Sequence, residues 1–220
     1  MTSCYCMGFV YNIIMKTQFP PKLVEAVHYL NQIQIVLCTL NTDGRRNSQE
    51  DEDIIIKLLQ DKFGEENIID GEDRYWWDVK IFGYYVNIKT SDFPKKAADN
   101  ISSFAGILYA FTQIPADKIA KYPRSQQFLN AMEGTRDVDN DRDYYLLVVD
   151  KSTTKVYLNS VKALAKITAN GNNLPFQIEW YKNTVPVQRT YSEAHDFVVQ
   201  CIKKGIKAQR AKWEGYEDKL

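Results

Sequence analysis

The 220-residue sequence has no net charge, because 28 basic side chains balance 28 acidic ones. That balance excludes a strongly basic, histone-like binder and an acidic disordered chain, although local basic patches can still contact nucleic acid. The sequence also has no internal repeats, no low-complexity linkers and no apolar run near the roughly 20 residues of a membrane span. We therefore expect residues 1–220 to form a single domain without a membrane partner.

The sequence also lacks the usual signature of a zinc site. Its four cysteines form no CxxC pair, and only two histidines could complete such a site, so a structural zinc is not expected. Free thiols are typical of the reducing cytosol, which favours a cytoplasmic location. The N-terminus has neither the basic start nor the cleavage site of a signal peptide. Met15 offers an alternative start, which makes residues 1–15 a candidate N-terminal extension.

Hydrophobic periodicity and turn residues predict an α/β domain with a central mixed β-sheet flanked by helices. Helices are expected at about 20–44, 48–63, 100–111, 161–167 and 191–213, and strands at 67–70, 75–81, 84–90, 144–150, 155–158 and 172–180. Phe82-Gly83 separates two β-rich segments and predicts a hairpin with a two-residue turn. The polar segment 115–143 gives no clear pattern.

The expected hairpin carries the most informative cluster of polar residues. With a two-residue turn at 82–83, Asp78 lies opposite Asn87, and Lys89 projects from the same face two residues further along. A carboxylate and an amide oxygen are suitable Mg²⁺ ligands, and a nearby lysine can orient water or stabilise charge on a phosphate. These residue types are typical of metal-assisted phosphodiester hydrolysis. The alternative is an exposed hairpin face with a surface salt bridge.

Glu52 is a fourth candidate residue. It precedes Ile55 and Leu59 at helical spacing, which places its carboxylate on the inward, apolar face of the second expected helix. A buried carboxylate is costly unless it is paired or bound to a metal. The other acids of the run 50–53, including Asp51, are interpreted as solvated. The alternative is that the helix begins later and that the whole run is its solvated first turn, favoured by the helix dipole.

Asp78, eight intervening residues and then Asn87-Ile88-Lys89 resemble the motif of the PD-(D/E)xK nuclease superfamily. The preceding helix with Glu52, the following basic loop and a packed helix fit the same fold. The segments VNIKTSDFPKKAADNISSFAGILYAFT, DYYLLVVDK and PFQIEWYKNTVPVQRTYSEAHDFV are similar to a type II restriction endonuclease, and the resemblance covers roughly residues 48–200. It implies a restriction-endonuclease-like core.

The resemblance further implies a site-specific, Mg²⁺-dependent endonuclease of a restriction–modification system that cuts double-stranded, palindromic DNA as a homodimer. Asp78 matches the first metal-binding acid, and Lys89 matches the motif lysine. Asn87 stands where the family has Asp or Glu. Either Glu52 supplies the missing charge to a metal site with Asp78 and Asn87, or the chain is a low-activity variant. The alternatives are a structure-specific repair nuclease of the same fold and a catalytically inactive DNA-binding protein.

DNA contacts are expected from loops and from the C-terminal segment. Amide and guanidinium side chains are the usual readers of adenine and guanine, and lysines pair with phosphates. The candidate DNA-binding residues are Lys95, Lys96, Asn100, Ser102, Ser103, Asn173, Gln177, Lys182, Asn183 and Arg189. Residues 191–220 are expected to contain a basic helix that carries Lys203, Lys204, Lys207, Arg210 and Lys212, with a merely solvated face as the alternative.

Overall fold

The computed structural model describes residues 19–38, 44–71, 75–96, 98–100, 104–119, 125–138, 140–168 and 176–213. Its α-helices are α1 Pro21–Gln32, α2 Gly44–Phe63, α3 Phe104–Phe111, α4 Ser125–Met132 and α5 Tyr191–Trp213. Its strands are β1 Ile68–Asp70, β2 Val79–Ile81, β3 Tyr84–Ser91, β4 Asp99–Asn100, β5 Tyr145–Asp150, β6 Val156–Ser160 and β7 Gln177–Ile178. Short 3₁₀ helices are η1 Phe93–Lys95, η2 Ala116–Lys118, η3 Val161–Ala163 and η4 Trp180–Lys182.

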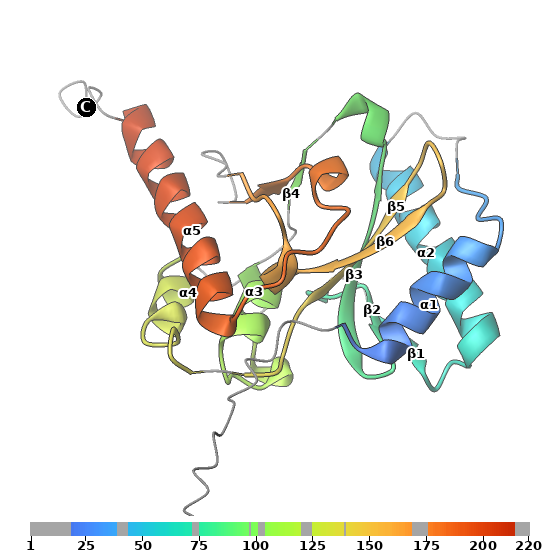
Figure 1. Cartoon of the computed structure of the whole chain (residues 1–220), viewed down its shortest axis with the longest axis horizontal. Coiled ribbons are helices and arrows are strands. Elements are labelled where there is room, and N and C mark those ends of the chain that lie inside the picture. The colour runs from blue at the N-terminus through green and yellow to red at the C-terminus, as the bar shows by residue number, and fades with distance from the viewer. Residues whose placement is uncertain are drawn as a thin grey trace, which may run out of the picture.

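The central sheet has five strands in the order β1-β2-β3-β5-β6. Within it β3 and β5 pair in parallel, and the remaining neighbours pair antiparallel. Helices α1 and α2 cover one side of the sheet, and α3 and α5 lie on the other (Figure 1). The prediction of an α/β domain with a central mixed sheet flanked by helices is confirmed. In the part of the chain that the structure describes, no helix combines the length and apolarity needed to cross a membrane.

The β2–β3 hairpin has the register that the sequence predicts. Val79 pairs with Val86 on either side of the turn. Phe82 and Gly83 both have positive φ, 49° and 87°, as in the two-residue turns whose twist matches paired strands. A positive φ is unusual for a bulky residue, and the Phe82 ring packs edge-on against Phe63 of α2 at 5.4 Å. Local backbone geometry and a tertiary contact therefore hold the turn together.

Two hydrophobic clusters lie on opposite sides of the sheet. Strand β5 is buried along its whole length, because its alternate residues serve opposite clusters. In β3, Val86 and Ile88 pack toward α1 and α2. The alternate residues Asn87 and Lys89 point to the opposite face of the strand. This polar break in an otherwise apolar sheet marks the candidate site.

Several predicted boundaries are wrong. The first helix ends at Gln32 rather than near Gly44, because Ile33 is extended and Ile35 packs into the core outside the helix. Gly44 instead begins α2, ahead of the expected start at 48. The expected helix 100–111 begins only at Phe104, and its first residue belongs to β4.

The second half of the chain follows the predicted order with shorter elements. The expected helix 161–167 is reduced to η3. Of the expected strand 172–180, residues 172–175 lie outside the described residues, and the rest contains β7, which pairs with β4 in a separate two-stranded sheet. The expected strand 155–158 is observed as β6, and the helix 191–213 is observed as α5. Residues 214–220 and the candidate extension 1–15 lie outside the described residues.

Candidate active site

Asp78 faces β3 from the position just before β2. Its backbone N–H donates to the carbonyl of Val86 at 3.0 Å, which continues the hairpin ladder by one residue. Its Oδ2 accepts a hydrogen bond from the backbone N–H of Ile88 at 2.7 Å. The carboxylate is thus fixed at the level of Asn87, as the hairpin register predicts.

Lys89 joins two carboxylates that come from different elements. Its Nζ lies 3.8 Å from Oε1 of Glu52 on α2 and 4.0 Å from Oδ2 of Asp78 on the hairpin. Both distances allow charge attraction but exceed the length of a hydrogen bond. The side chain of Lys89 is 20% exposed and those of the two acids are each 23% exposed. The structure therefore brings three of the predicted catalytic residues together at one partly buried position.

The electrostatic environment favours protonation of both carboxylates. Burial, followed by the charge of Asp78, raises the pKa of Glu52 to about 7. Burial also raises the pKa of Asp78, against the opposing effects of Lys89 and of the Ile88 N–H. The protein's own groups thus leave negative charge here only partly compensated. A cation held between the two acids would restore the balance.

Asn87 is 3% exposed, and its side chain is hydrogen-bonded to the hydroxyl of Tyr144. That hydroxyl donates its single proton to the carbonyl of Trp76 at 2.7 Å, so Asn87 is the donor of its own bond, through the amide N–H. An ionised carboxylate has no proton to donate at this position. This contact accounts for an amide where the motif has an acid.

Asp51, interpreted from the sequence as solvated, is fully buried, so that interpretation is wrong. Its Oδ2 lies 3.0 Å from Nζ of Lys151. Its Oδ1 accepts a hydrogen bond from the backbone N–H of Cys38 at 2.6 Å. The buried charge is therefore neutralised by a close cation and a backbone donor, as a stable buried carboxylate requires.

The acidic run 50–53 lies inside α2 rather than at its start. Because α2 begins at Gly44, the alternative of a later helix with a solvated first turn is wrong. Asp51 shares its helix face with Ile55 and Leu59, since these residues follow at intervals of four. That spacing is visible in the sequence and could have identified Asp51 as an inward residue.

The oxygen donors of the site suit Mg²⁺. Among the described residues, no group of three or more His, Cys, Asp or Glu side chains is arranged to hold a metal. Mg²⁺ keeps several of its waters and is commonly bound through only one or two protein carboxylates. Glu52 and Asp78 supply those carboxylates, and Asn87 places an amide group beside Asp78. The residues present therefore fit Mg²⁺.

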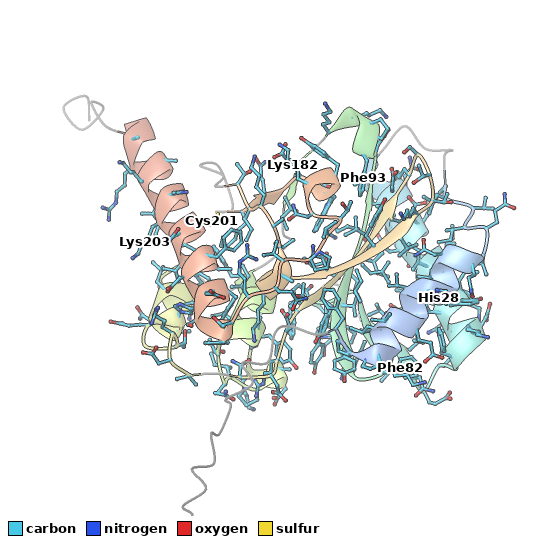
Figure 2. All side chains as sticks on the ribbon, in the orientation of Figure 1. His28, Phe82, Phe93, Lys182, Cys201 and Lys203 are labelled. Atoms are coloured by element: carbon cyan, nitrogen blue, oxygen red, sulfur yellow. The ribbon has the colours of Figure 1, made fainter. Side chains whose placement is uncertain are left out.

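The lysines among the predicted DNA-binding residues lie at the surface. Lys95 and Lys96, in η1 and directly after it, are exposed, and Nζ of Lys95 lies 2.7 Å from Asp92. Lys182 of η4, labelled in Figure 2, lies 2.8 Å from Glu179. Ion pairs between such exposed groups are weak and exchange readily with other anions. Lys95 and Lys96 therefore remain available to a phosphate, whereas Lys182 is held more firmly, because it bonds both oxygens of Glu179, which is 20% exposed.

The polar candidates divide into two groups. Asn100 of β4 pairs with Gln177 of β7, so two distant segments lie side by side. Asn183 is 2% exposed, and its amide bonds to backbone groups of neighbouring segments. Arg189 donates to backbone carbonyls at 2.8 and 3.4 Å. We therefore leave Asn183 and Arg189 out of the candidate DNA surface, since both hold the fold together. Ser102, Ser103 and Asn173 lie outside the described residues.

The second half of α5 is basic on its outer side. Lys203 points away from the body of the protein, whereas Cys201 packs into the core (Figure 2). The other exposed basic residues of this half are Lys204, Lys207 and Arg210, and the side chain of Lys212 lies outside the described residues. Because the apolar side of α5 packs into the core, its basic side faces outward.

No known protein-family model, curated protein or solved structure matches the chain. The function is therefore inferred from the sequence motif, from the contacts around Lys89 and from the elements that carry them.

Proposed function

We propose that this chain is a Mg²⁺-dependent endonuclease of the restriction type, in which Asp78, Asn87 and Lys89 occupy the positions of the PD-(D/E)xK motif. The observation that carries the proposal is the convergence of Glu52 and Asp78, from a helix and a hairpin, on Lys89 at 3.8 and 4.0 Å. The element order supports it as well: α2, three antiparallel strands, the two-residue β4, α3, α4, and then β5 beside β3 in parallel. This arrangement is compatible with the restriction-endonuclease-like core that the resemblance implies.

Each residue of the site has a role that its contacts support. The Ile88 N–H fixes the carboxylate of Asp78, and α2 delivers Glu52 to the same place. Mg²⁺ bound by these oxygens would polarise the phosphate and provide a more acidic water. Lys89 orients the attacking water or stabilises charge on the phosphate, because its ammonium lies beside both acids. Asn87 completes the polar face next to Asp78.

A purely structural ion-pair cluster is less consistent with these contacts. A buried pair stabilises a fold only with close geometry and further hydrogen bonds, as at Asp51, which lies 3.0 Å from Lys151 and accepts a hydrogen bond from the Cys38 N–H. Lys89 lies farther from both of its acids. The raised pKa of Glu52 also means that its charge opposes folding. Charge maintained at such a cost is typical of functional sites.

The proposed substrate is palindromic double-stranded DNA, cut by a homodimer in the cytoplasm. A two-fold symmetric dimer matches a two-fold symmetric DNA sequence. Lys95, Lys96 and Lys182 are candidate phosphate contacts, together with the basic side of α5. Asn100 and Gln177 are candidate readers of base edges, since amide groups pair with adenine.

Incubation of the full chain with phage DNA and Mg²⁺ tests this function. A restriction enzyme gives discrete bands with uniform fragment ends, and a chelator abolishes them. A smear, or cutting confined to branched DNA, would replace the restriction assignment with a structure-specific nuclease. DNA left intact with Mg²⁺ and with Mn²⁺ would overturn the nuclease function and leave a DNA-binding protein.

A structure-specific nuclease is the second candidate, because partly exposed aromatic side chains lie beside Asp78. Trp77 directly precedes Asp78, and its ring centroid lies 5.6 Å from that of Tyr85. Tyr85 shares a face of β3 with Asn87 and Lys89. Aromatic groups of this kind stack on bases that are not paired in a duplex.

A further inference from the structure

Four aromatic side chains, Tyr75, Trp77, Tyr85 and Tyr109, form a continuous group next to Asp78, which we call the aromatic platform. The ring centroids of Tyr75 and Trp77 are 5.3 Å apart, and those of Trp77 and Tyr85 are 5.6 Å apart. Tyr109 of α3 meets Tyr85 edge to face at 4.9 Å. The platform therefore joins the hairpin to a helix on one side of the sheet.

The platform is partly exposed and rests on a buried ring. Tyr75 is 48% exposed, and Trp77, Tyr85 and Tyr109 are half-buried. Beneath them, Trp76 is 5% exposed, and its centroid lies 4.9 Å from Tyr85 and 5.3 Å from Tyr109. Rings supported in this way hold a π surface in a fixed orientation. The protein side chains therefore lose little conformational entropy when a ligand stacks on them.

Two cations lie over rings of the platform. Lys80 pairs with Tyr85 across the hairpin, and its Nζ lies 4.8 Å from the Tyr85 centroid and 5.7 Å from that of Trp77. The guanidinium of Arg142 lies 5.3 Å from the Tyr109 centroid and donates to a backbone carbonyl at 2.6 Å. Aromatic rings that carry cations over them suit a nucleic acid strand, because a phosphate can meet the cation while a base stacks on a neighbouring ring.

We propose that the aromatic platform stacks an unpaired base next to the scissile phosphate, in the strand that Asp78 and Lys89 hold. This inference rests on the nuclease function proposed above. Trp77 of the platform directly precedes Asp78, and Tyr85 shares the β3 face of Lys89, so a phosphate at the acids places its neighbouring base over these rings. A base inside an intact duplex is already stacked on its neighbours. The bound duplex is therefore opened at the cut, so that one base leaves the stack and lies on these rings.

Binding of an oligothymidylate and of a blunt duplex of equal length, measured without divalent metal, tests the platform. We expect the single strand to quench tryptophan fluorescence and to bind more tightly than the duplex. Tyr75→Ala should weaken oligothymidylate binding by about tenfold, the size expected for the loss of one base–aromatic stack. Trp77→Leu should weaken it by at least the same factor, and Trp77→Phe should recover most of the affinity.

Tyr84→Ala is the matched control. Tyr84 precedes Tyr85 in the sequence and is 38% exposed, but it faces the other side of β3 and packs edge-on against Tyr145. Its removal should leave single-strand affinity unchanged. Equal losses in Tyr84→Ala and Tyr75→Ala would overturn the inference. Wild-type affinity in Tyr75→Ala, with an unchanged unfolding transition, would overturn it as well.

Asp78→Asn separates this inference from the nuclease function. The variant should stop cutting DNA while it keeps the fluorescence change and the affinity for single strands. If the wild-type chain cuts DNA but Tyr75→Ala and Trp77→Leu bind like wild type, the base-stacking proposal is wrong and the nuclease function is retained. If the wild-type chain binds single strands through Tyr75 and cuts no DNA, the nuclease function fails and base stacking on the platform stands.

Discussion

Asp51 and Glu52 are adjacent on α2, and each faces a lysine in or directly after a strand of the sheet, yet the two pairs differ. Asp51 is fully buried and lies 3.0 Å from Lys151, with a further hydrogen bond from the Cys38 N–H. Glu52 is 23% exposed and lies 3.8 Å from Lys89. Burial and the charge of Asp78 raise the pKa of Glu52 to about 7. The Asp51 pair is close and well compensated, whereas the Glu52 pair is loose and leaves charge uncompensated.

Under the proposed function, this difference separates a structural pair from a catalytic one. Lys151 directly follows β5, and its backbone N–H donates to the carbonyl of Ser91 at the end of β3 at 2.9 Å. The Asp51–Lys151 pair thereby anchors α2 to the ends of the two parallel strands. That anchor fixes the turn of α2 from which Glu52 reaches the hairpin. We infer that Asp51 holds the helix in place and that Glu52 takes part in the chemistry.

The largest expected effect is on the cleavage rate and comes from Asp78, the second carboxylate beside Lys89. Asp78→Asn keeps an acceptor for the Ile88 N–H but removes the charge that would hold Mg²⁺. Single-turnover cleavage should slow by at least about a thousandfold, or about 4 kcal/mol of transition-state free energy. Asp61→Asn, which changes an acid of α2 that is 59% exposed, should cut at the wild-type rate. A fully active Asp78→Asn protein would contradict the site assignment.

The second effect should appear in stability and should come from Asp51. Asp51→Asn keeps an acceptor for the Cys38 N–H but leaves the ammonium of Lys151, which is 30% exposed, without its carboxylate, and this loss should cost about 1–3 kcal/mol. Urea unfolding should show this loss, whereas Glu50→Gln on the exposed side should change the unfolding free energy by less than about 0.5 kcal/mol. The double variant Asp51→Leu with Lys151→Met should regain part of the loss. Equal stabilities of Asp51→Asn and Glu50→Gln would show that the Asp51–Lys151 pair does not anchor α2.

The third effect depends on pH and concerns Glu52. Its pKa is about 7 in the folded chain against 4.5 for an unperturbed glutamate, so the native state keeps a proton that the unfolded state releases between these values. Stability therefore falls as the pH rises through this range. Glu52→Gln cannot ionise, so it should match wild type below about pH 4.5 and exceed it by on the order of 2 kcal/mol above about pH 7.

Urea unfolding across this pH range measures the difference between Glu52→Gln and wild type. Cleavage should fall in the same variant although it is the more stable protein at high pH. A constant difference at every pH, or a variant that is less stable than wild type above about pH 7, would show that Glu52 is a structural partner like Asp51.

The smallest expected effect is at Asn87. Asn87→Asp loses the N–H donated to Tyr144 and brings a further carboxylate beside Asp78, so without divalent metal the melting temperature should fall by about 2–4 °C. Mg²⁺ should restore most of that loss, because the cation attracts the new charge. Asn87→Ala should lose stability that Mg²⁺ does not restore. Identical responses of the two variants to Mg²⁺, read by thermal unfolding, would place Asn87 outside the metal site.

The hairpin part of the site could be predicted because it is encoded locally. The turn at 82–83 fixes the register, and the alternation of strand residues then places Asp78, Asn87 and Lys89 on one face. The long amphipathic helix α5 could be predicted for a similar reason, since its pattern repeats over many turns. In both cases neighbouring residues specify the geometry without help from the rest of the chain.

Contacts between distant segments could not be predicted in this way. Lys151 meets Asp51, and Tyr144 meets Asn87, only after β5 has taken its place beside β3. Tyr109 reaches the aromatic platform from α3. The early end of α1 has the same origin, because tertiary packing of the segment that follows it overrides the helical spacing of the sequence.

Calorimetric titration of the full chain with Mg²⁺ tests most directly whether Glu52 and Asp78 form a cation site around Lys89. We expect a single site whose affinity rises as the pH increases from about 6 to 8, because the Glu52 carboxyl must first lose its proton. Asp78→Asn and Glu52→Gln should each weaken binding by about tenfold or more, and Glu50→Gln should bind like wild type. Equal Mg²⁺ affinity in wild type, Asp78→Asn and Glu52→Gln at high pH would contradict the site.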